Sequence, residues 1–405
     1  MRNSLETLEI PDEWDRSGLP AWTYFNKELL DLETEVLFRR HWQLACHQSD
    51  LPEPGSYVCF DMSGERAVIL RGEDGVVRAF HNVCRHRGSR VVVKTKGQCR
   101  SALVCPFHGW SYNLDGTLRS PARPKSLPKL DPVAFGLKPL ESEIWMGFVF
   151  IRFKPSDQPA VKEIMAPFEA EAALYDAPDM VPAYRGFWKS ETAVNWKAVR
   201  DVDNEGYHVP MAHPGLQDLY GHGYFDEPLA GGANRSFGPF NDGPGRLWSV
   251  RNYKKILPDR PQLPESHKRA WVYLGMFPNT VIAFYPESMM FYQEFPVHAG
   301  LTLQRGATYR YKDETRQMRL ARYLSTRIDK ATSKEDVQLT IWSCEAAKSS
   351  GFDGIMLSDL EYGVRSFHDR LRELLPVMGR AGEPQTGTME RVNNDMLMCC
   401  AVQGT

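Results

Sequence analysis

Two short segments that each pair a cysteine with a histidine limit what the first third of this chain can fold into. Cys84-Arg85-His86 and Cys105-Pro106-Phe107-His108 are separated by eighteen residues. Two thiols and two imidazoles on tight loops form a four-ligand set, and a tetrahedral zinc ion is its simplest occupant. Cys-x-His is a short spacing for zinc, however. Gly88 and Gly109 would also let backbone N–H groups approach sulfur, which tunes iron–sulfur clusters. The pattern therefore favours a cluster over zinc.

The residues around these loops read as short strands. Runs of β-branched or aromatic residues with turn signals between them are typical of antiparallel hairpins. The expected strands are 56–60, 67–70, 76–80, a hairpin over 112–118 that turns at Asp115-Gly116, and a last strand over 145–151. These runs predict a compact antiparallel unit over residues 42–155.

The rest of the chain has a different pattern. Its 405 residues are more than twice the ~150 of an average domain. Strands and helices are segregated rather than alternating, which favours an α+β fold over a doubly wound one. The expected elements are a helix over 161–174, an extended loop over 228–264, strands over 271–285 and 289–297, and helices over 334–348 and 358–375. The predicted domains are 1–41, a helical lead-in that packs on the catalytic domain, then 42–155 and 156–405.

Charge and cysteine usage exclude several classes of protein. The 49 basic and 51 acidic residues give a net charge of -2, so neither nucleic acid nor an anionic membrane is expected as a partner. The first residues lack the apolar core of a signal peptide, so a cytoplasmic location is expected. Eight cysteines are too few for a disulfide scaffold. We expect buried single thiols at Cys46, Cys59, Cys99 and Cys344, and no disulfide between the neighbours Cys399 and Cys400.

The two Cys-His segments resemble the Rieske signature. The similarity covers Cys84 to Gly88 and Cys105 to Tyr112. It implies that Cys84 and Cys105 hold one iron of a [2Fe–2S] cluster, while His86 and His108 hold the other. Neutral imidazoles in place of two thiolates raise the potential of such a cluster. This signature alone would also fit a small electron carrier.

A second group of metal-ligating residues follows at His208 and His213. On an unbroken helix these residues would lie about 140° apart. Pro210 disfavours a helix at Val209, so we expect His208 to close one helix and His213 to come from the next segment. Two histidines and one carboxylate make the facial triad of iron(II) oxygenases. The resemblance to Rieske oxygenases points to Asp336 as the carboxylate. The competitors are Glu335, Glu345 and Asp359, of which Asp359 starts a helix and could serve as its N-cap.

Glu205 precedes His208 by three residues, which on a helix would place it on the same face one turn back. In the family, an acidic residue here hydrogen-bonds the iron-ligating histidine. It also reaches a cluster histidine of the neighbouring subunit, which would be His108. Most ring-hydroxylating members carry Asp at this place, whereas Glu resembles members that act on carnitine, glycine betaine or stachydrine. Asp201 is a candidate for a supporting role only.

The resemblance implies an antiparallel Rieske domain followed by a helix-grip (START/Bet v1-like) catalytic domain, assembled as a homotrimer. It implies a terminal oxygenase with one [2Fe–2S] cluster and one mononuclear iron(II), which uses O2. Because the chain has no Gly-x-Gly-x-x-Gly element, the NAD(P)H-dependent flavin and iron–sulfur reductase should be a separate protein.

The substrate is less well defined by the sequence. Hydroxylation of a betaine-like quaternary ammonium, with loss of formaldehyde, is favoured by Glu205 and by cation–π attraction to aromatic residues. A ring-hydroxylating dioxygenase for an aromatic acid is the alternative, and a non-catalytic electron-transfer protein is a third. The aromatic candidates are Tyr207, Tyr224, Phe225, Trp271, Tyr273, Phe284, Tyr285, Phe291, Tyr292 and Trp342.

Overall fold

The computed structural model describes residues 13–403, with side chains to residue 399. Its contacts divide the chain into two compact units. One unit is Leu37–Pro182, and the other combines residues 13–36 with residues 183–403. Antiparallel strands with separate helices make up the fold, so the predicted α+β class is confirmed. None of the described helices combines the length and the apolar composition that crossing a membrane would require.

The unit Leu37–Pro182 is built from three small antiparallel sheets. Their strand orders are β4-β3-β2-β5, β1-β10-β9 and β6-β7-β8. The strands are β1 (Gln43–His47), β2 (Ser56–Met62), β3 (Glu65–Arg71), β4 (Val77–His81), β5 (Lys96–Gln98), β6 (Leu103–Val104), β7 (Ser111–Tyr112), β8 (Leu118–Ser120), β9 (Glu141–Trp145) and β10 (Phe148–Arg152). The predicted strands at 56–60, 67–70 and 76–80 and the turn at Asp115-Gly116 lie where the sequence placed them.

The sequence predicts a single strand over residues 145–151, but the structure differs. β9 ends at Trp145 and β10 begins at Phe148, so the segment holds a tight hairpin. Met146 (φ 48°) and Gly147 (φ 80°) both adopt positive φ, as a two-residue hairpin turn requires. The apolar run concealed the turn because methionine is an unusual residue there.

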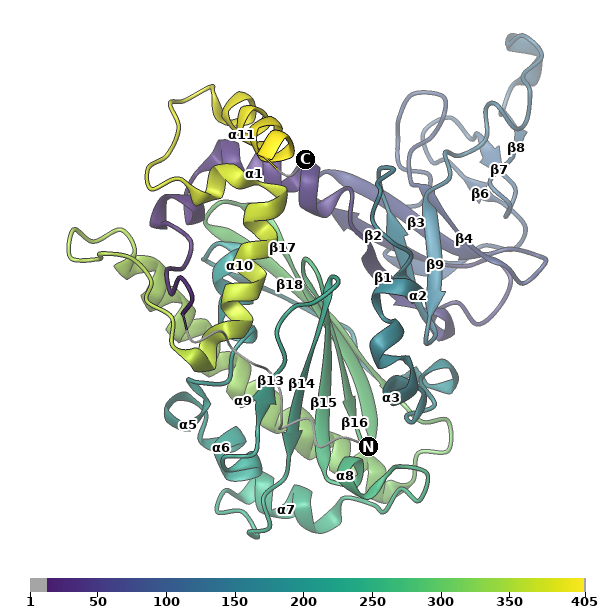
Figure 1. Ribbon diagram of the computed structural model, residues 1–405. Helices are drawn as coiled ribbons and strands as arrows, with labels where there is room; N and C mark the ends of the chain where they lie inside the picture. The colour runs from purple at the N-terminus through teal and green to yellow at the C-terminus, as the bar shows by residue number, and fades with distance from the viewer. Residues whose placement is uncertain (1–12, 404–405) are drawn as a thin grey trace. The chain divides into compact units, whose positions relative to one another are not determined.

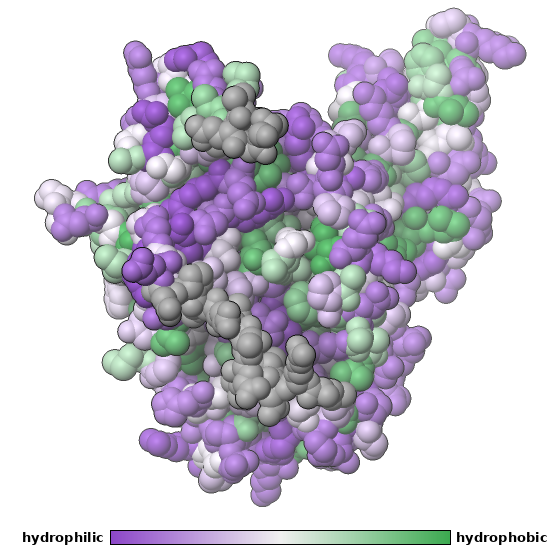
Figure 2. Space-filling model, in the orientation of Figure 1, coloured by the Kyte–Doolittle hydropathy of each residue, from purple (hydrophilic) through white to green (hydrophobic). Residues whose placement is uncertain are grey.

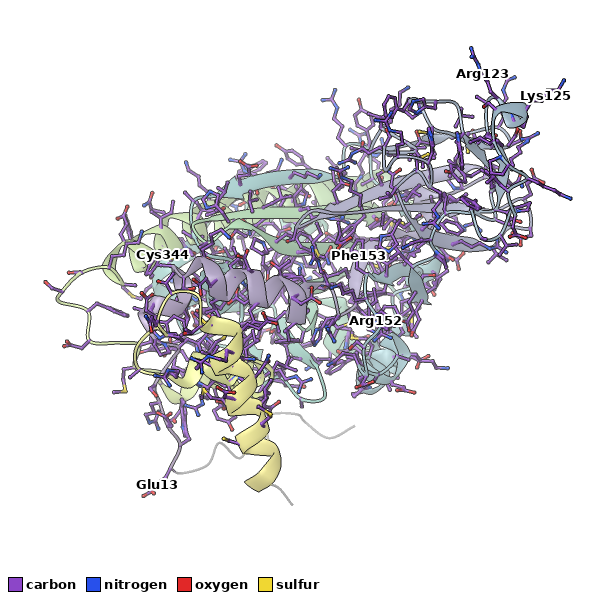
Figure 3. The ribbon with its side chains drawn as sticks, turned by 90° about the horizontal axis from the view of Figure 1, so that it is seen from above. Glu13, Arg123, Lys125, Arg152, Phe153 and Cys344 are labelled. Atoms are coloured by element: carbon purple, nitrogen blue, oxygen red, sulfur yellow. The ribbon has the colours of Figure 1, made fainter. Side chains whose placement is uncertain are left out.

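Short helices follow these strands within the same unit. The predicted helix over 161–174 is interrupted, because Pro167 cannot continue the preceding turns. The helical segments are η3 (Gln48–Asp50), η4 (Pro124–Ser126), α2 (Val161–Ile164), η5 (Ala166–Phe168), α3 (Glu169–Ala173) and η6 (Ala177–Asp179). Residues 156–182 group with the preceding strands here, and the predicted boundaries at 41/42 and 155/156 stay predictions. Arg123 directly precedes η4 and Lys125 lies within it, and both side chains point outward (Figure 3).

The second unit contains one large antiparallel sheet, which Figure 1 shows as a fan of strands. Its strand order is β13-β14-β15-β16-β17-β18-β12. The strands are β12 (Trp188–Thr192), β13 (Phe225–Asp226), β14 (Ala233–Pro239), β15 (Ala270–Met276), β16 (Thr280–Tyr285), β17 (Ser288–His298) and β18 (Leu301–Arg310). The predicted loop over 228–264 is wrong, since β14 and α7 (Trp248–Ile256) lie within it. Gly and Pro flank these two elements, which made the region look like one loop.

The long helix α9 (Arg316–Ala346) packs against this sheet. Ala321, Leu324 and Ile328 of α9 share a buried core with Trp271 of β15 and Tyr285 of β16. This is the expected helix-grip arrangement. The sequence showed only residues 334–348 of the helix. The other helical segments are η1 (Ala21–Tyr24), α1 (Lys27–Glu33), η2 (Thr34–Phe38), α4 (Trp196–Asp203), α5 (Val209–Ala212), α6 (Pro214–Tyr220), α8 (Glu265–Lys268), η7 (Asp359–Glu361), α10 (Tyr362–Leu374), η8 (Pro376–Gly379) and α11 (Met389–Gln403).

Residues 13–36 are anchored on this unit by buried polar contacts. Glu33 of α1 accepts hydrogen bonds from Lys197 Nζ (2.5 Å) and Trp196 Nε1 (2.7 Å) of α4, and both charged side chains are fully buried. Tyr24 OH donates to Asp201 (2.6 Å). Residues 1–12 of the expected lead-in lie outside the described residues. On the face drawn in Figure 2, hydrophilic side chains predominate, with hydrophobic ones between them.

The described cysteines are all free thiols. Cys46 is buried as expected, whereas Cys59, Cys99 and Cys344 are half-buried. Cys399 is exposed, and the Cys400 side chain lies outside the described residues.

Candidate metal centres and active-site cavity

The two Cys-His loops of the unit Leu37–Pro182 have the same backbone design. Gly88 N donates to Cys84 O (2.9 Å), and Gly109 N donates to Cys105 O (3.0 Å). Each glycine has a positive φ, 72° and 69°, which closes the loop behind its histidine. Two matched loops thus present a cysteine and a histidine each.

The donor atoms of these loops suit a cluster. Cys84 and Cys105 are buried, while His86 and His108 are exposed and their rings lie 4.6 Å apart, centroid to centroid. The Tyr112 hydroxyl lies 3.2 Å from Cys84 Sγ and accepts a hydrogen bond from Arg85 N. Among the described residues, these four donors are not gathered within 4.8 Å as ligands of a single ion would be. This wider spacing fits two irons better than one zinc.

A second set of donors converges in the other unit. His208 Nε2 and His213 Nε2 lie 2.9 Å apart, and Asp336 Oδ1 lies 2.8 Å from His213 Nε2 and 3.5 Å from His208 Nε2. All three ligand atoms fall within 4.8 Å of one another, as a mononuclear metal site requires. The geometry therefore brings together the two histidines and the carboxylate that the sequence singled out.

The local backbone differs from its prediction. α4 ends at Asp203, and Glu205 to His208 are not helical. His208 is the N-cap of the short helix α5, and His213 stands between α5 and α6. We expected Pro210 to disfavour a helix at Val209. It lies instead in the first turn of α5, where the N–H that proline lacks would have no helical partner, so the helix forms.

Each histidine has a carboxylate on its second ring nitrogen. His208 Nδ1 donates to Glu205 Oε1 (2.5 Å), and Glu205 Oε2 accepts from His208 N (3.1 Å). His213 Nδ1 donates to Glu335 Oε2 (2.9 Å). Such bonds fix the tautomer, so that Nε2 faces the metal position. Glu205 thus reaches His208 by a loop and not along a helix face.

The competitors for the third ligand lie elsewhere. Glu335 is on the far side of His213 from the converging Nε2 atoms. Glu345 is exposed near the end of α9, and Asp359 pairs with Arg16 (2.6 Å) while Ser358 caps η7. Asp201 accepts from His368 Nε2 (2.9 Å) and from Tyr24, away from the three donors.

Electrostatics favour a cation at this site. Burial disfavours a charged imidazole, but the Asp336 and Glu205 carboxylates outweigh it and raise the pKa of His208 to about 10. Burial opposes the charge on Asp336 as well, but the two histidines lower its pKa. The excess of negative charge that holds protons here would equally hold a divalent metal ion, so the residues present fit mononuclear iron.

The three donors open into a cavity of about 1410 Å³ within the same unit. Seven tyrosines line it, together with seven acidic side chains and eight lysines and arginines, and four of the tyrosines were among the aromatic candidates. Trp271, Phe284 and Phe291 are instead buried in the core, and Tyr207 and Trp342 are more than half exposed. Tyr220 also lines the cavity but was not among the candidates from the sequence. Its hydroxyl lies 3.1 Å from that of Tyr273. The tyrosines that line the cavity are Tyr184, Tyr220, Tyr224, Tyr273, Tyr285, Tyr292 and Tyr323.

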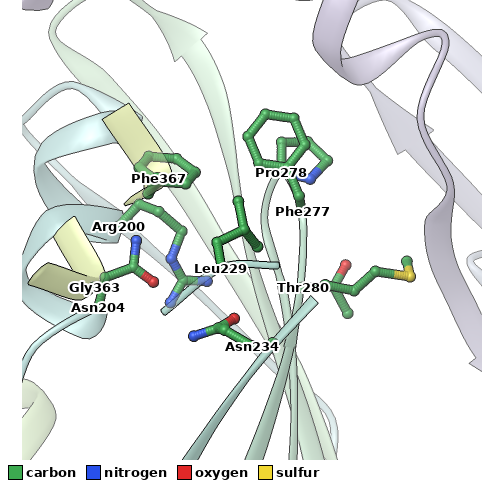
Figure 4. A pocket seen from close by; sticks show the side chains of 11 residues that line it. Arg200, Asn204, Leu229, Asn234, Phe277, Pro278, Thr280, Gly363 and Phe367 are labelled. Atoms are coloured by element: carbon green, nitrogen blue, oxygen red, sulfur yellow. The ribbon is translucent and has the colours of Figure 1, made fainter. Parts of the chain in front are cut away.

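A much smaller space of about 10 Å³ lies beside Arg200 and Asn204 (Figure 4). Arg200 Nη1 contacts Glu294 Oε1 (3.0 Å). Arg200 Nε and Asn204 Nδ2 have no protein hydrogen-bond partner among the described residues. The space has room for one water that could satisfy these donors, and none for a substrate.

Comparison with known proteins agrees with this geometry. Residues 41–131 match the Rieske [2Fe-2S] domain, and residues 182–376 match the catalytic domain of the ring hydroxylating alpha subunit. The chain is 33% identical over 218 residues to the carnitine monooxygenase oxygenase subunit of Acinetobacter pittii, covering 52% of this chain and 57% of that protein. It is also 33% identical over 199 residues to the glycine betaine monooxygenase oxygenase subunit of Pseudomonas aeruginosa, covering 49% and 45%. These alignments span about half the length of the relatives.

A solved structure extends the likeness over most of the chain. The quaternary ammonium Rieske monooxygenase described with carnitine oxidation and inter-subunit electron transfer superposes with a TM-score of 0.75 at 25% identity. The match covers 88% of this chain and 95% of that one. The chain therefore belongs to the Rieske non-haem iron oxygenases, with a [2Fe–2S] Rieske domain and the mononuclear iron domain of their alpha subunits.

Proposed function

We propose that this protein is a terminal oxygenase that oxidises a quaternary ammonium compound of the betaine type. The observation that carries the proposal is the triad His208, His213 and Asp336 at the wall of a cavity whose lining includes seven tyrosines. Tyrosine faces attract a cation that has no N–H to donate. Relatives named as carnitine and glycine betaine monooxygenases support the same class.

In this proposal Cys84, His86, Cys105 and His108 hold the cluster, and His208, His213 and Asp336 hold the iron. Iron at this site, fed with single electrons, supplies the activation of dioxygen. Glu205 and Glu335 fix the imidazoles, while the cavity orients the substrate. One oxygen atom enters a C–H bond next to nitrogen, and the other leaves as water with two electrons and two protons. An N-hydroxymethyl product then releases formaldehyde, a proton and the tertiary amine.

Two partners belong to the proposal. Electrons would come from a separate reductase that oxidises NAD(P)H. A homotrimer would place each cluster beside the iron of a neighbouring copy, with Glu205 between His208 and the neighbour's His108. Both ends of this route reach the surface, since His86 and His108 are exposed and Tyr207, next to His208, is 54% exposed. The cytoplasmic location stays a prediction.

Oxygen consumption tests the proposal. The reconstituted protein with a reductase and NADH should consume oxygen on carnitine, glycine betaine or a related cation, with formaldehyde or another oxygenated product found by mass spectrometry. Asp336→Ala is the matched control and should stop product formation. Product from aromatic acids alone would favour the ring-hydroxylating alternative, and cluster reduction without any product would favour an electron carrier.

A further inference from the structure

Asp329 is an acidic residue of α9 that faces the large cavity without a cationic partner. Its Oδ1 accepts a hydrogen bond from Tyr285 OH (3.1 Å), and no described lysine or arginine pairs with it. Glu294 and Glu33 of this unit are paired with cations, Arg200 (3.0 Å) and Lys197 (2.5 Å). Glu287 and Asp226 have hydroxyl partners instead, but neither of them lines the cavity. An unpaired carboxyl at the wall of a cavity is either protonated or paired with a cation that enters the cavity.

The surroundings of Asp329 define what kind of cation fits. Tyr285 lies edge-on to Tyr273, with ring centroids 6.1 Å apart, and the Tyr273 hydroxyl contacts that of Tyr220. These hydroxyls already bond one another or Asp329. Tyr285 is 3% exposed and stacks on Trp271 with ring centroids 4.3 Å apart, so the half-buried Tyr273 supplies most of the accessible aromatic surface here. A methylated ammonium suits such a wall better than a metal ion or a primary amine, because it needs no hydrogen-bond acceptors.

The position of Asp329 on its helix relates it to the iron site. Asp329 and Asp336 are seven residues apart on α9, close to two turns, so both project from the same face into the cavity. The separation along the axis is about 10 Å. A nitrogen held between the two would place its methyl and methylene groups toward the metal donors.

We propose that Asp329, with Tyr285 and Tyr273, forms the subsite for the cationic head of the substrate, with Asp329 as its counter-ion. This inference rests on the proposed function and adds the residue that sets its charge preference. Because a bound cation stabilises the carboxylate, binding to the protonated form requires the release of one proton.

The pH dependence of binding follows from the surroundings of Asp329. Burial, together with the nearby Glu287, raises the pKa of Asp329 to about 8. Tyr285, Tyr273, Tyr220 of α6 and Tyr253 of α7 also face it, and burial raises the pKa of each, so they stay neutral between pH 6 and 9. Glu287 accepts hydrogen bonds from Tyr253 and Ser325, and Lys330 follows Asp329 on α9 without pairing with it.

Calorimetry with tetramethylammonium chloride on the oxidised holoprotein tests the subsite without turnover. Wild-type protein should bind about 50-fold more weakly at pH 6 than at pH 8, with proton uptake by the buffer. Asp329→Asn should bind at least tenfold more weakly at pH 8 and lose the pH dependence, while Asp329→Glu should keep part of both. Asp226→Asn removes a buried carboxyl that does not line the cavity, so it should keep the wild-type pH dependence.

Two results would overturn the subsite and leave the proposed function intact: pH-independent binding by the wild type, or unchanged binding by Asp329→Asn, with oxygenation of a quaternary ammonium still observed. Failure of the wild type to bind or oxidise any quaternary ammonium would instead overturn the proposed function and the subsite together. Circular dichroism of Asp329→Asn should match the wild type, and a folded variant with normal affinity counts against the subsite.

Discussion

Each imidazole of the proposed iron site is held on the ring nitrogen that faces away from the metal position. Glu205 holds His208, and Glu335 holds His213. The side chain that carries the ligand atom is thus separate from the one that orients it. Replacing one or the other should have different consequences.

His208→Ala should abolish product formation while the visible absorption of the cluster remains. The variant loses one of three iron ligands, whereas the cluster donors lie on the other unit. Iron and sulfide analysis together with the absorption spectrum measure this. A bleached protein would contradict the division of the donors into two metal sites.

Glu205→Gln and Glu335→Gln form a matched pair, since each replaces a carboxylate on Nδ1 of one histidine. Glu205→Gln should keep both metals and slow reoxidation of the reduced cluster in a single turnover at least tenfold, because Glu205 is proposed to lie on the electron route. Glu335→Gln should instead weaken iron retention about 10-fold and spare the transfer rate of iron-loaded protein. Equal transfer rates in the two variants would remove the bridging role from Glu205.

The sequence could predict these site residues only in part. His208, His213 and the cluster residues belong to dense local motifs. Glu335 was considered only as a ligand, because its distance from His213 in the chain hides which nitrogen it meets. Asp329 gave no signal, since an acidic residue on a helix ordinarily faces water, and only the path of β16 brings Tyr285 to it.

At the level of secondary structure, periodic segments were predicted well and turn positions were not. The sequences of β2, β3 and β4 are either continuous apolar runs or alternate between apolar and polar residues. Their local preference for a strand therefore agrees with the sheet in which they pack. The β9–β10 turn has only Gly147 as a signal, because Met146 is forced to positive φ by the strands on either side. α5 carries a proline that reads as a helix breaker until its place in the first turn is known.

The β9–β10 hairpin also encloses His47 of β1, which makes the stability of the fold depend on pH. His47 ends β1, and a Cβ on Gly147 would lie 2.1 Å from its Nε2, so the turn leaves no space beside the ring. Burial lowers the pKa of His47 from 6.5 to about 4. Unfolding therefore takes up a proton, and stability that is complete above pH 6.5 falls by about 3 kcal/mol as the pH drops to 4.

Unfolding of the wild type and His47→Asn between pH 4 and 7 measures this. Asparagine can replace the Nδ1 acceptor that caps Ser49 N but does not titrate. The variant should lose less stability than the wild type over this range. Parallel pH profiles would show that His47 takes up its proton in the folded state.

At the scale of the whole molecule, the sequence predicts the homotrimer only through its resemblance to the family. Light scattering should give about 139 kDa, three chains of 46.2 kDa. A mixture of inactive subunits tests the electron route directly. Co-expressed Cys105→Ser, which lacks a cluster, and His208→Ala, which lacks iron, should regain about a quarter of wild-type activity in random trimers, because each iron then needs a neighbour's cluster.

No recovered activity in mixed trimers would show that electrons stay within one chain. Separately purified homotrimers, mixed without subunit exchange, are the control and should remain inactive. The sequence does show a change of pattern, from a strand-rich first part to a mixed second part. The arrangement of copies depends on surfaces that leave no periodicity in the chain.

The spacing of Asp329 and Asp336 on α9 has a consequence for regiochemistry. A rigid helix fixes the distance between Asp329, which would anchor the cation, and Asp336, which would hold the iron. This distance does not depend on the tail of the ligand. Compounds with longer or branched tails would differ in how long they stay bound, yet the carbon attacked would remain one attached to nitrogen.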